Sequence, residues 1–333
     1  MIKQLDLLAE AGDLEGLRKA LVPEPLPLAG RETIQIILVR EVQDYAIFRT
    51  EETRELNTVW TPGKSGNDGK SEGPAAVEPV ERVAFLATKQ KAAESRELEG
   101  LLRTWGGDGV PECYLKSALC LSCPRCVLFG ATDVSKGREK GANIKHRIAY
   151  ATAFSLLPVD PDLRETHTFN GVDEATQLTG STLNVRESVR PCSLFASIVT
   201  LRAVTEAEFV LTLKSILSCT RYGAETRIGG FVRNHVVGLV AAQEEILSPL
   251  ELTLALADGQ ATDPSTVQDV LENYRKRCGT PEAARVLPPQ DLTRVLEAAQ
   301  QVVFDKEKLR KIYDTAEKFR ERQKTYTKKA KEK

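Results

Sequence analysis

The 333-residue sequence contains few histidines, no long apolar run and almost no net charge. No apolar run approaches the roughly 20 residues that a membrane-spanning helix needs. The N-terminal residues lack the basic start and the continuous apolar core of a signal peptide. From these absences we expect a cytoplasmic protein with no membrane partner.

The motifs of several common enzyme classes are also absent. The sequence has no P-loop, no HExxH metalloprotease motif, no GxSxG nucleophile elbow and no dinucleotide-binding fingerprint. Its 3 histidines provide few general bases. We therefore expect no catalytic residue in this chain.

The charge balance restricts how the chain could bind a polyanion. The sequence has 46 Lys and Arg residues against 47 Asp and Glu residues, so bulk charge does not favour nucleic acid. Residues 305–333, however, contain 12 basic residues against 6 acidic ones. A nucleic-acid partner would therefore have to bind at local basic surfaces.

Hydrophobic patterning predicts several elements along the chain. Buried strands are expected at residues 33–39 and 82–88, with a possible short strand at 45–48. A helix should end at Gly106-Gly107. Asp263-Pro264 starts a later helix, and Pro288-Pro289 starts another that could run on into the charged tail.

The sequence pattern at residues 193–239 predicts a strand, a capped helix and a second strand. Thr205 and Glu208 form a T-x-x-E capping box after the first strand. The helix should end near Cys219, because a basic residue and then Gly223 follow it. Strands that alternate with helices predict an α+β fold with a modified RRM-like (ferredoxin-like) antiparallel sheet core. The usual RRM aromatic motif is missing, so RNA would not be read in the ordinary RRM way.

The turn between this helix and the second strand is basic and rich in glycine. Guanidinium groups suit phosphates, an aromatic ring can stack on a base, and glycines allow a polynucleotide backbone to approach closely. The alternative is a solvated loop with ordinary surface arginines. The candidate RNA-binding residues of this turn and the following strand are Arg221, Tyr222, Arg227, Arg233 and His235. Tyr222 would either stack on a base or pack against the protein.

Four of the 7 cysteines fall within a short segment. A cytoplasmic chain should not hold them as disulfides, and four thiolates suit a tetrahedral zinc ion with a structural role. An iron–sulfur cluster is the alternative, because C-x-x-C-x-x-C spacing also occurs in cluster ligation. His146 or His167 could substitute for one cysteine. The candidate ligands are Cys113, Cys120, Cys123 and Cys126.

A basic segment follows the cysteines. This segment, residues 134–147, contains two glycines, and only Asp133 and Glu139 oppose its basic residues. It is interpreted either as a loop that touches nucleic acid or as a solvated connection. The candidate RNA-binding residues in it are Lys136, Arg138, Lys140, Lys145 and Arg147.

Residues 200–239 resemble the backbone subunit of type I-D CRISPR interference complexes. The pattern TRYGA-x-T followed by RNH-x-VG, at residues 220–238, carries most of this resemblance. Residues 180–195 and the cysteine cluster also fit the family. The resemblance covers roughly the middle 150 residues.

The resemblance implies a non-catalytic subunit that binds CRISPR guide RNA in several copies and presents it to target DNA. Its implied partners are other copies of itself and the large and end-capping subunits of the same complex. It also implies a protruding hairpin, called the thumb, that reaches a neighbouring subunit. The polar residues 166–192 are the candidate for this hairpin.

Five regions follow from these expectations. They are the first part of the core with an N-terminal helix and a flexible loop at 61–78 (residues 1–105), the zinc-binding insertion with its basic loop (106–165), the thumb (166–192), the second part of the core (193–248) and a helical C-terminal region with a basic tail (249–333).

Two other functions remain open from sequence. One is a metal-dependent RNase like the related type III backbone subunits, which cut target RNA with a loop aspartate. Asp44 lies near the first strand, but no motif assigns it that role. The other is a stand-alone, zinc-stabilised RNA-binding protein.

Overall fold

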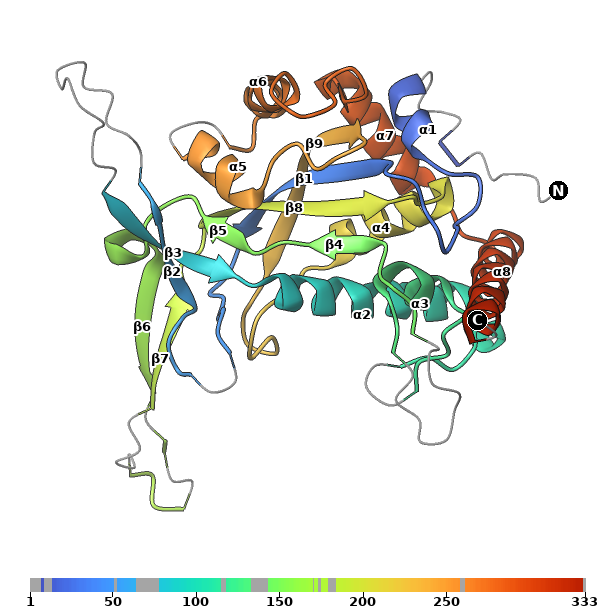
Figure 1. Ribbon diagram of the computed structural model, residues 1–333. Coiled ribbons are helices and arrows are strands. Elements are labelled where there is room, and N and C mark those ends of the chain that lie inside the picture. The colour runs from blue at the N-terminus through green and yellow to red at the C-terminus, as the bar shows by residue number, and fades with distance from the viewer. Residues whose placement is uncertain are drawn as a thin grey trace.

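A computed structural model describes residues 7–8, 14–50, 53–63, 78–114, 118–132, 143–169, 171–172, 175–178, 184–257 and 261–331. The chain folds around a mixed α+β body with a large antiparallel sheet, and a separate two-stranded hairpin extends from it (Figure 1). The expected α+β class and antiparallel sheet are therefore confirmed. Within the described residues, no helix is long and apolar enough to span a membrane.

Strand β1 (Thr33–Val42) lies at the centre of the sheet and pairs with β8 (Leu194–Arg202) and β9 (Val232–Ala242). All but one of its residues are buried, as expected for a strand covered on both faces. The outer strands are β2 (Thr58–Pro62), β3 (Pro79–Phe85), β4 (Ile148–Tyr150), β5 (Ala153–Ser155) and β10 (Arg285–Val286). The sheet order is β10-β9-β1-β8-β5-β3-β2, and β4 also pairs with β8.

Helices cover both faces of this sheet. Because side chains alternate along a strand, Ile36 and Leu38 of β1 join the core beneath the first group of helices, whereas Ile37 and Val39 join the other. The first group is α1 (Glu15–Ala20), α2 (Ala87–Gly106), α4 (Glu206–Ser218) and α7 (Pro289–Gln301). The second is α5 (Pro249–Leu256) and α6 (Pro264–Arg275). Most residues of the central strands are therefore buried beneath helices.

Local signals place the helix starts. The capping box of α4 is present: Glu208 N–H donates to Thr205 Oγ1 (3.3 Å), and Thr205 N–H donates to Glu208 Oε2 (2.9 Å). Asp263 caps α6 as expected. The predicted strand at 82–88 is too long, because β3 ends at Phe85 and α2 begins at Ala87.

The C-terminal region contains two helices where the sequence suggested one continuous run. Helix α7 ends at Gln301, and α8 (Lys306–Lys331) begins after a short break. Phe304 in the break is buried and stacks on Trp105, with ring centroids 5.0 Å apart. Asp305 then accepts a hydrogen bond from Lys308 N–H (2.8 Å), which caps α8. Burial of Phe304 and the new cap together turn the chain.

The hairpin of β6 (Arg164–Phe169) and β7 (Asn184–Val189) extends away from the body (Figure 1). Its position agrees with the hairpin expected at 166–192. The pairing ends at Phe169 and Asn184. The expected loop at 61–78 starts later, because Thr61 and Pro62 belong to β2, and residues 64–77 lie outside the described residues. Residues 46 and 47 form only isolated bridges.

Candidate nucleic-acid interface and metal centre

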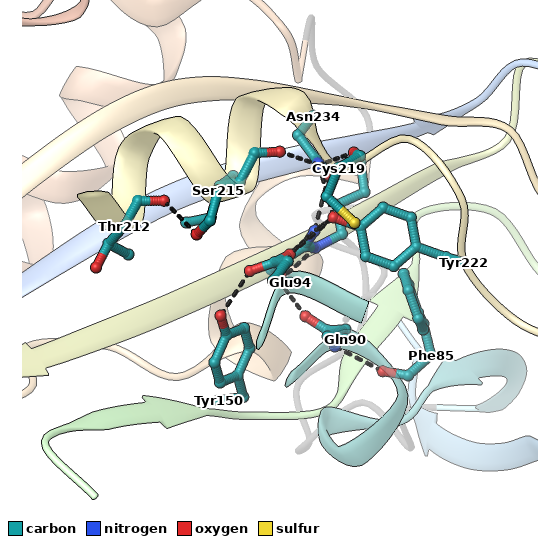
Figure 2. Close-up of polar contacts among 12 residues, drawn as sticks. Phe85, Gln90, Glu94, Tyr150, Thr212, Ser215, Cys219, Tyr222 and Asn234 are labelled. Carbon is teal, nitrogen blue, oxygen red and sulfur yellow. Dashed lines mark hydrogen bonds and ion pairs between the residues drawn. The ribbon is translucent and has the colours of Figure 1, made fainter. Parts of the chain in front are cut away.

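A buried polar network lies between β1, α2 and the segment that follows α4 (Figure 2). Arg40 is fully buried and forms an ion pair with Glu94, with 2.6 Å between Nη1 and Oε1. The same nitrogen donates to Asn234 Oδ1 (2.8 Å), and Nε donates to Ser197 Oγ (3.1 Å). Further hydrogen bonds offset the cost of burying an ion pair, although Arg40 Nη2 has no partner among the described residues. These contacts connect four strands and helices into one unit.

Tyr222 and Asn234 belong to this network, so of the two roles expected for Tyr222 the structure shows packing against the protein and not an exposed ring. Tyr222 is 1% exposed and donates its hydroxyl to Glu94 Oε1 (2.9 Å). Asn234 donates to the Tyr222 hydroxyl (2.8 Å) and to the carbonyls of Ile216 (2.7 Å) and Cys219 (3.1 Å). The Tyr222 ring packs inside the protein and cannot stack on a base.

The network fixes the charge states of its members. Burial alone would lower the pKa of Arg40, but the Glu94 carboxylate more than offsets this and raises the Arg40 pKa above its ordinary value. Burial and the nearby Glu94 charge raise the pKa of Tyr222 and of Tyr150 well above the ordinary value. Arg40 is therefore a cation, and both phenols are neutral hydrogen-bond donors.

The glycines of the turn allow the protein's own backbone segments to approach one another closely. Gly223 and Gly230 have φ angles of +90° and +75°, which other residues rarely adopt. A Cβ atom on Gly230 would lie 2.2 Å from the Tyr222 carbonyl oxygen, and one on Gly229 would lie 2.5 Å from that of Tyr45. Gly230 N–H donates to the Tyr45 carbonyl (2.7 Å). The expected close approach is thus made by residues of the same chain.

Arg221 is exposed and lies at a basic cavity of about 410 Å³. Its guanidinium donates to the Gly229 carbonyl (3.1 Å) and lies over the Phe231 ring at 5.3 Å, which leaves other donors free to bind a ligand. Lys89 and Arg96 of α2 line the same cavity, as does Glu97, so three cations there face one carboxylate. Sequence reasoning missed this pair, although residues seven apart on a helix share a face.

The remaining candidate arginines lie apart from this cavity. Arg227 is exposed near the tip of the turn, and Arg233 is exposed on β9. Arg233 and His235 alternate with Asn234, so they lie on the opposite face of β9 from the buried network. His235 Nε2 is 2.9 Å from Glu41 Oε2, so this ring already has a partner. In the described part of the chain, neither Arg227 nor Arg233 forms an ion pair.

Glu225 connects the turn to the base of the hairpin. It forms ion pairs with Arg49 (2.9 Å) and with Arg186 of β7. Ala224 N–H also donates to the Ile47 carbonyl (2.9 Å), and Val189 of β7 bridges with Ala46. The turn, the segment after β1 and the hairpin base therefore form a single structural unit.

The predicted basic loop is only partly described. Lys136, Arg138 and Lys140 lie outside the described residues, and Lys145 is exposed. Arg147 is buried: it pairs with Glu208, donates to the Ala203 carbonyl (2.9 Å) and lies 5.3 Å from the Phe319 ring centroid. The expectation that Arg147 binds RNA is therefore wrong. It precedes β4 directly, and its side chain faces the core.

The four candidate cysteines converge as expected. Their Sγ atoms all lie within 4.8 Å of one another. Cys113 Sγ is 3.5 Å from Cys126 Sγ and 3.7 Å from Cys123 Sγ. Cys123 is the N-cap of α3 (Pro124–Phe129), where it accepts a hydrogen bond from Cys126 N–H (3.4 Å). The fourth member, Cys120, is half-buried. Neither His146 nor His167 belongs to this group.

The chemistry of the cluster fits a metal ion. Contacts with the other three thiols lower the pKa of Cys120 and raise that of Cys123. Four convergent sulfur atoms can complete a tetrahedral coordination shell. Two buried oxygens have no hydrogen-bond partner in the described structure: the Tyr313 hydroxyl and Glu99 Oε2. The cluster could therefore hold one metal ion and would leave no open position for a catalytic water.

These features define an α+β protein with a cluster of four cysteines that could hold a metal ion and a separate cavity that Arg221 lines. The Csc2 CRISPR family matches residues 19–328. Since the match covers most of the sequence, the chain belongs to the Csc2 CRISPR family. No curated protein matches the sequence.

The fold is similar to that in the crystal structure of Thermofilum pendens Csc2. The two are 20% identical with a TM-score of 0.67, and the match covers 98% of this chain and 98% of that one. A chain of a CRISPR RNA-guided surveillance complex is 14% identical with a TM-score of 0.45, covering 73% of this chain and 83% of that one. A chain of a pre-nicking surveillance complex is 11% identical with a TM-score of 0.47, covering 74% and 88%.

Proposed function

We propose that this chain is a guide-RNA-binding backbone subunit of a type I-D CRISPR surveillance complex. Membership of the Csc2 CRISPR family supports this function. The observation that carries it is the cavity where Arg221 joins Lys89 and Arg96, because three cations at one concave surface suit a phosphodiester backbone. Arg227, Arg233 and Lys145 are exposed and lie outside this cavity, and we propose that they make separate contacts with phosphates.

The proposed mode of binding is independent of RNA sequence. Arginine and lysine contact phosphates, while the central sheet is covered by helices on both faces. Bases therefore stay available to pair with target DNA, and base pairing supplies the specificity. Other copies of the chain, the large subunit and the end-capping subunit are the partners that this role requires.

The core and hairpin also support this role. The strand order β9-β1-β8-β5, with α2 and α4 on the same side, supports a modified ferredoxin-like core. We assign β6–β7 as the thumb that reaches the next copy along the RNA. Glu225 ties its base to the arginine-bearing turn through Arg186. The proposed contact with the neighbouring copy and the proposed contact with RNA would thus both depend on Glu225.

The metal in this proposal is zinc, held by the four clustered cysteines. Its role is structural, because the thiolates fill the coordination shell. Elemental analysis of the purified protein should give about one zinc per chain. Iron with visible absorbance would assign a cluster instead, and four freely reactive thiols without metal would reject both.

We further propose that the chain does not cut nucleic acid. Asp44 lies beside the turn, and its Oδ1 accepts a hydrogen bond from Tyr45 N–H (2.8 Å), so the type III-like alternative has one carboxylate near the interface. The test offers labelled complementary RNA and single-stranded DNA with Mg²⁺ or Mn²⁺ to the assembled complex. Intact strands are expected. Regularly spaced fragments that disappear in Asp44→Ala would establish the nuclease.

Copurification tests the proposed function directly. The chain is expressed with its CRISPR locus, isolated under native conditions and analysed for RNA and subunit stoichiometry. We expect RNA of uniform length with several copies of this chain on each strand. RNA of mixed length on a single copy would instead identify a stand-alone RNA-binding protein.

A further inference from the structure

Helix α8 closes one side of the cysteine cluster. Ala316 and Phe319 of α8 are buried in the same apolar group as Cys113, Cys123 and Cys126. Tyr313 packs against this group and also against the main core. A helix from the far end of the sequence thus completes the surroundings of a site whose candidate ligands all lie at residues 113–126.

The hydroxyl of Tyr313 is the unexplained feature of this contact. It is buried and has no hydrogen-bond partner in the described structure. A tyrosine hydroxyl is protonated at neutral pH, so it can donate a hydrogen bond. A buried donor without a partner costs about 1–3 kcal/mol, so a partner is expected when the site is filled.

We propose that Tyr313 is a positioning residue that donates a hydrogen bond to a metal-bound cysteine thiolate, and that this contact anchors α8 on the metal centre. The inference rests on the metal site assigned in the proposed function. Thiolates that bind a metal retain negative charge and accept hydrogen bonds from nearby donors. Tyr313 is the residue of α8 that brings such a donor to the cluster.

The position of Tyr313 within α8 gives the contact a structural consequence. On its N-terminal side, Leu309 and Ile312 pack into the main core. On its C-terminal side, the polar attachments include Arg322 to Glu24 (2.5 Å) and Gln323 to the Asn143 carbonyl (2.5 Å), both at exposed sites. Exposed polar contacts hold a helix weakly. The metal centre, with Phe319, should therefore hold the C-terminal half of α8 in place.

Glu99 provides a competing explanation. Its Oε2 atom is also buried without a partner, so a small rotation could pair it with the Tyr313 hydroxyl instead. Substituting both residues separates the alternatives. If the hydroxyl serves a thiolate, Tyr313→Phe weakens metal binding equally in the native and the Glu99→Gln backgrounds. If that loss disappears in the Glu99→Gln background, the carboxylate is the partner and the proposal is wrong.

The first experiment measures zinc affinity by competition with a chromophoric chelator. Tyr313→Phe keeps the ring and removes only the hydroxyl, and loss of such a contact should weaken metal binding about 10- to 100-fold. Tyr326→Phe is the matched control, because Tyr326 lies on the same helix and is 50% exposed. Cobalt-substituted protein should show a shifted thiolate-to-metal absorption band in Tyr313→Phe alone. Equal affinities and equal spectra in the two variants would overturn the proposal.

The second experiment measures hydrogen exchange of the full chain with and without metal. Removing the metal should raise exchange about tenfold or more in peptides from residues 313–331, while β1 and β8 remain protected. If the chain binds metal but hydrogen exchange in α8 is unchanged when the metal is removed, the anchoring is refuted. A chain that binds no metal at all would refute the metal site of the proposed function and this inference with it.

Discussion

The buried side and the exposed side of residues 220–235 use their polar groups in opposite ways. On the buried side, Tyr222 and Asn234 find their partners inside the protein, around the Arg40–Glu94 ion pair. On the exposed side, Arg221 keeps donors free at a cavity shared with α2. The distinctive motif residues Tyr222 and Asn234 therefore act in folding. In the proposed function, the arginines next to and between them provide the surface that contacts RNA phosphates.

The largest loss of stability is expected when one charge of the buried ion pair is removed. Arg40→Met leaves Glu94 as an uncompensated buried carboxylate, which should lower the free energy of unfolding by about 3–5 kcal/mol. The control is Arg202→Gln, which breaks an exposed ion pair with Glu245. Its effect should stay within about 1 kcal/mol. If denaturant unfolding gives similar losses of unfolding free energy for the two variants, the buried ion pair contributes no more to stability than the exposed one.

A smaller effect is expected from the turn that supports this network. Gly230→Ala forces a non-glycine residue to φ +75° and brings its Cβ against the Tyr222 carbonyl. Strain of this kind costs about 1–3 kcal/mol. Gly171→Ala is the control, because a Cβ there meets no atom within 4 Å. A Gly230→Ala protein as stable as the control would contradict the role assigned to this glycine.

The smallest stability effect is expected for the Tyr222 hydroxyl. Tyr222→Phe keeps the packed ring but removes one hydrogen bond to Glu94 and an acceptor for Asn234. The expected loss is about 1–2 kcal/mol, measured by urea unfolding. If Tyr222→Phe lost RNA affinity without losing stability, Tyr222 would be an RNA-binding residue and its assignment to the buried network would be wrong.

The features that sequence predicted correctly depend on near neighbours in the chain. The Thr205–Glu208 capping box spans one helical turn, and the four cysteines lie close enough for their spacing to indicate a common ligand. Arg40 and Asn234 are separated by 194 residues, so only the folded sheet reveals their contact. Arg147 shows the same limit: a locally basic run suggested an exposed cation, but packing beside β4 places it against Glu208.

The most direct test of this account is the salt dependence of single-stranded RNA binding for Arg221→Ala and Tyr222→Phe, measured on folded protein. Each phosphate contact contributes about 0.7 to the slope of log affinity against log salt. Arg221→Ala should lower the slope by about that amount and change stability by less than about 0.5 kcal/mol, while Tyr222→Phe should leave the slope unchanged. A reduced slope in Tyr222→Phe with a native slope in Arg221→Ala would contradict the division between a buried support and an exposed phosphate-binding surface.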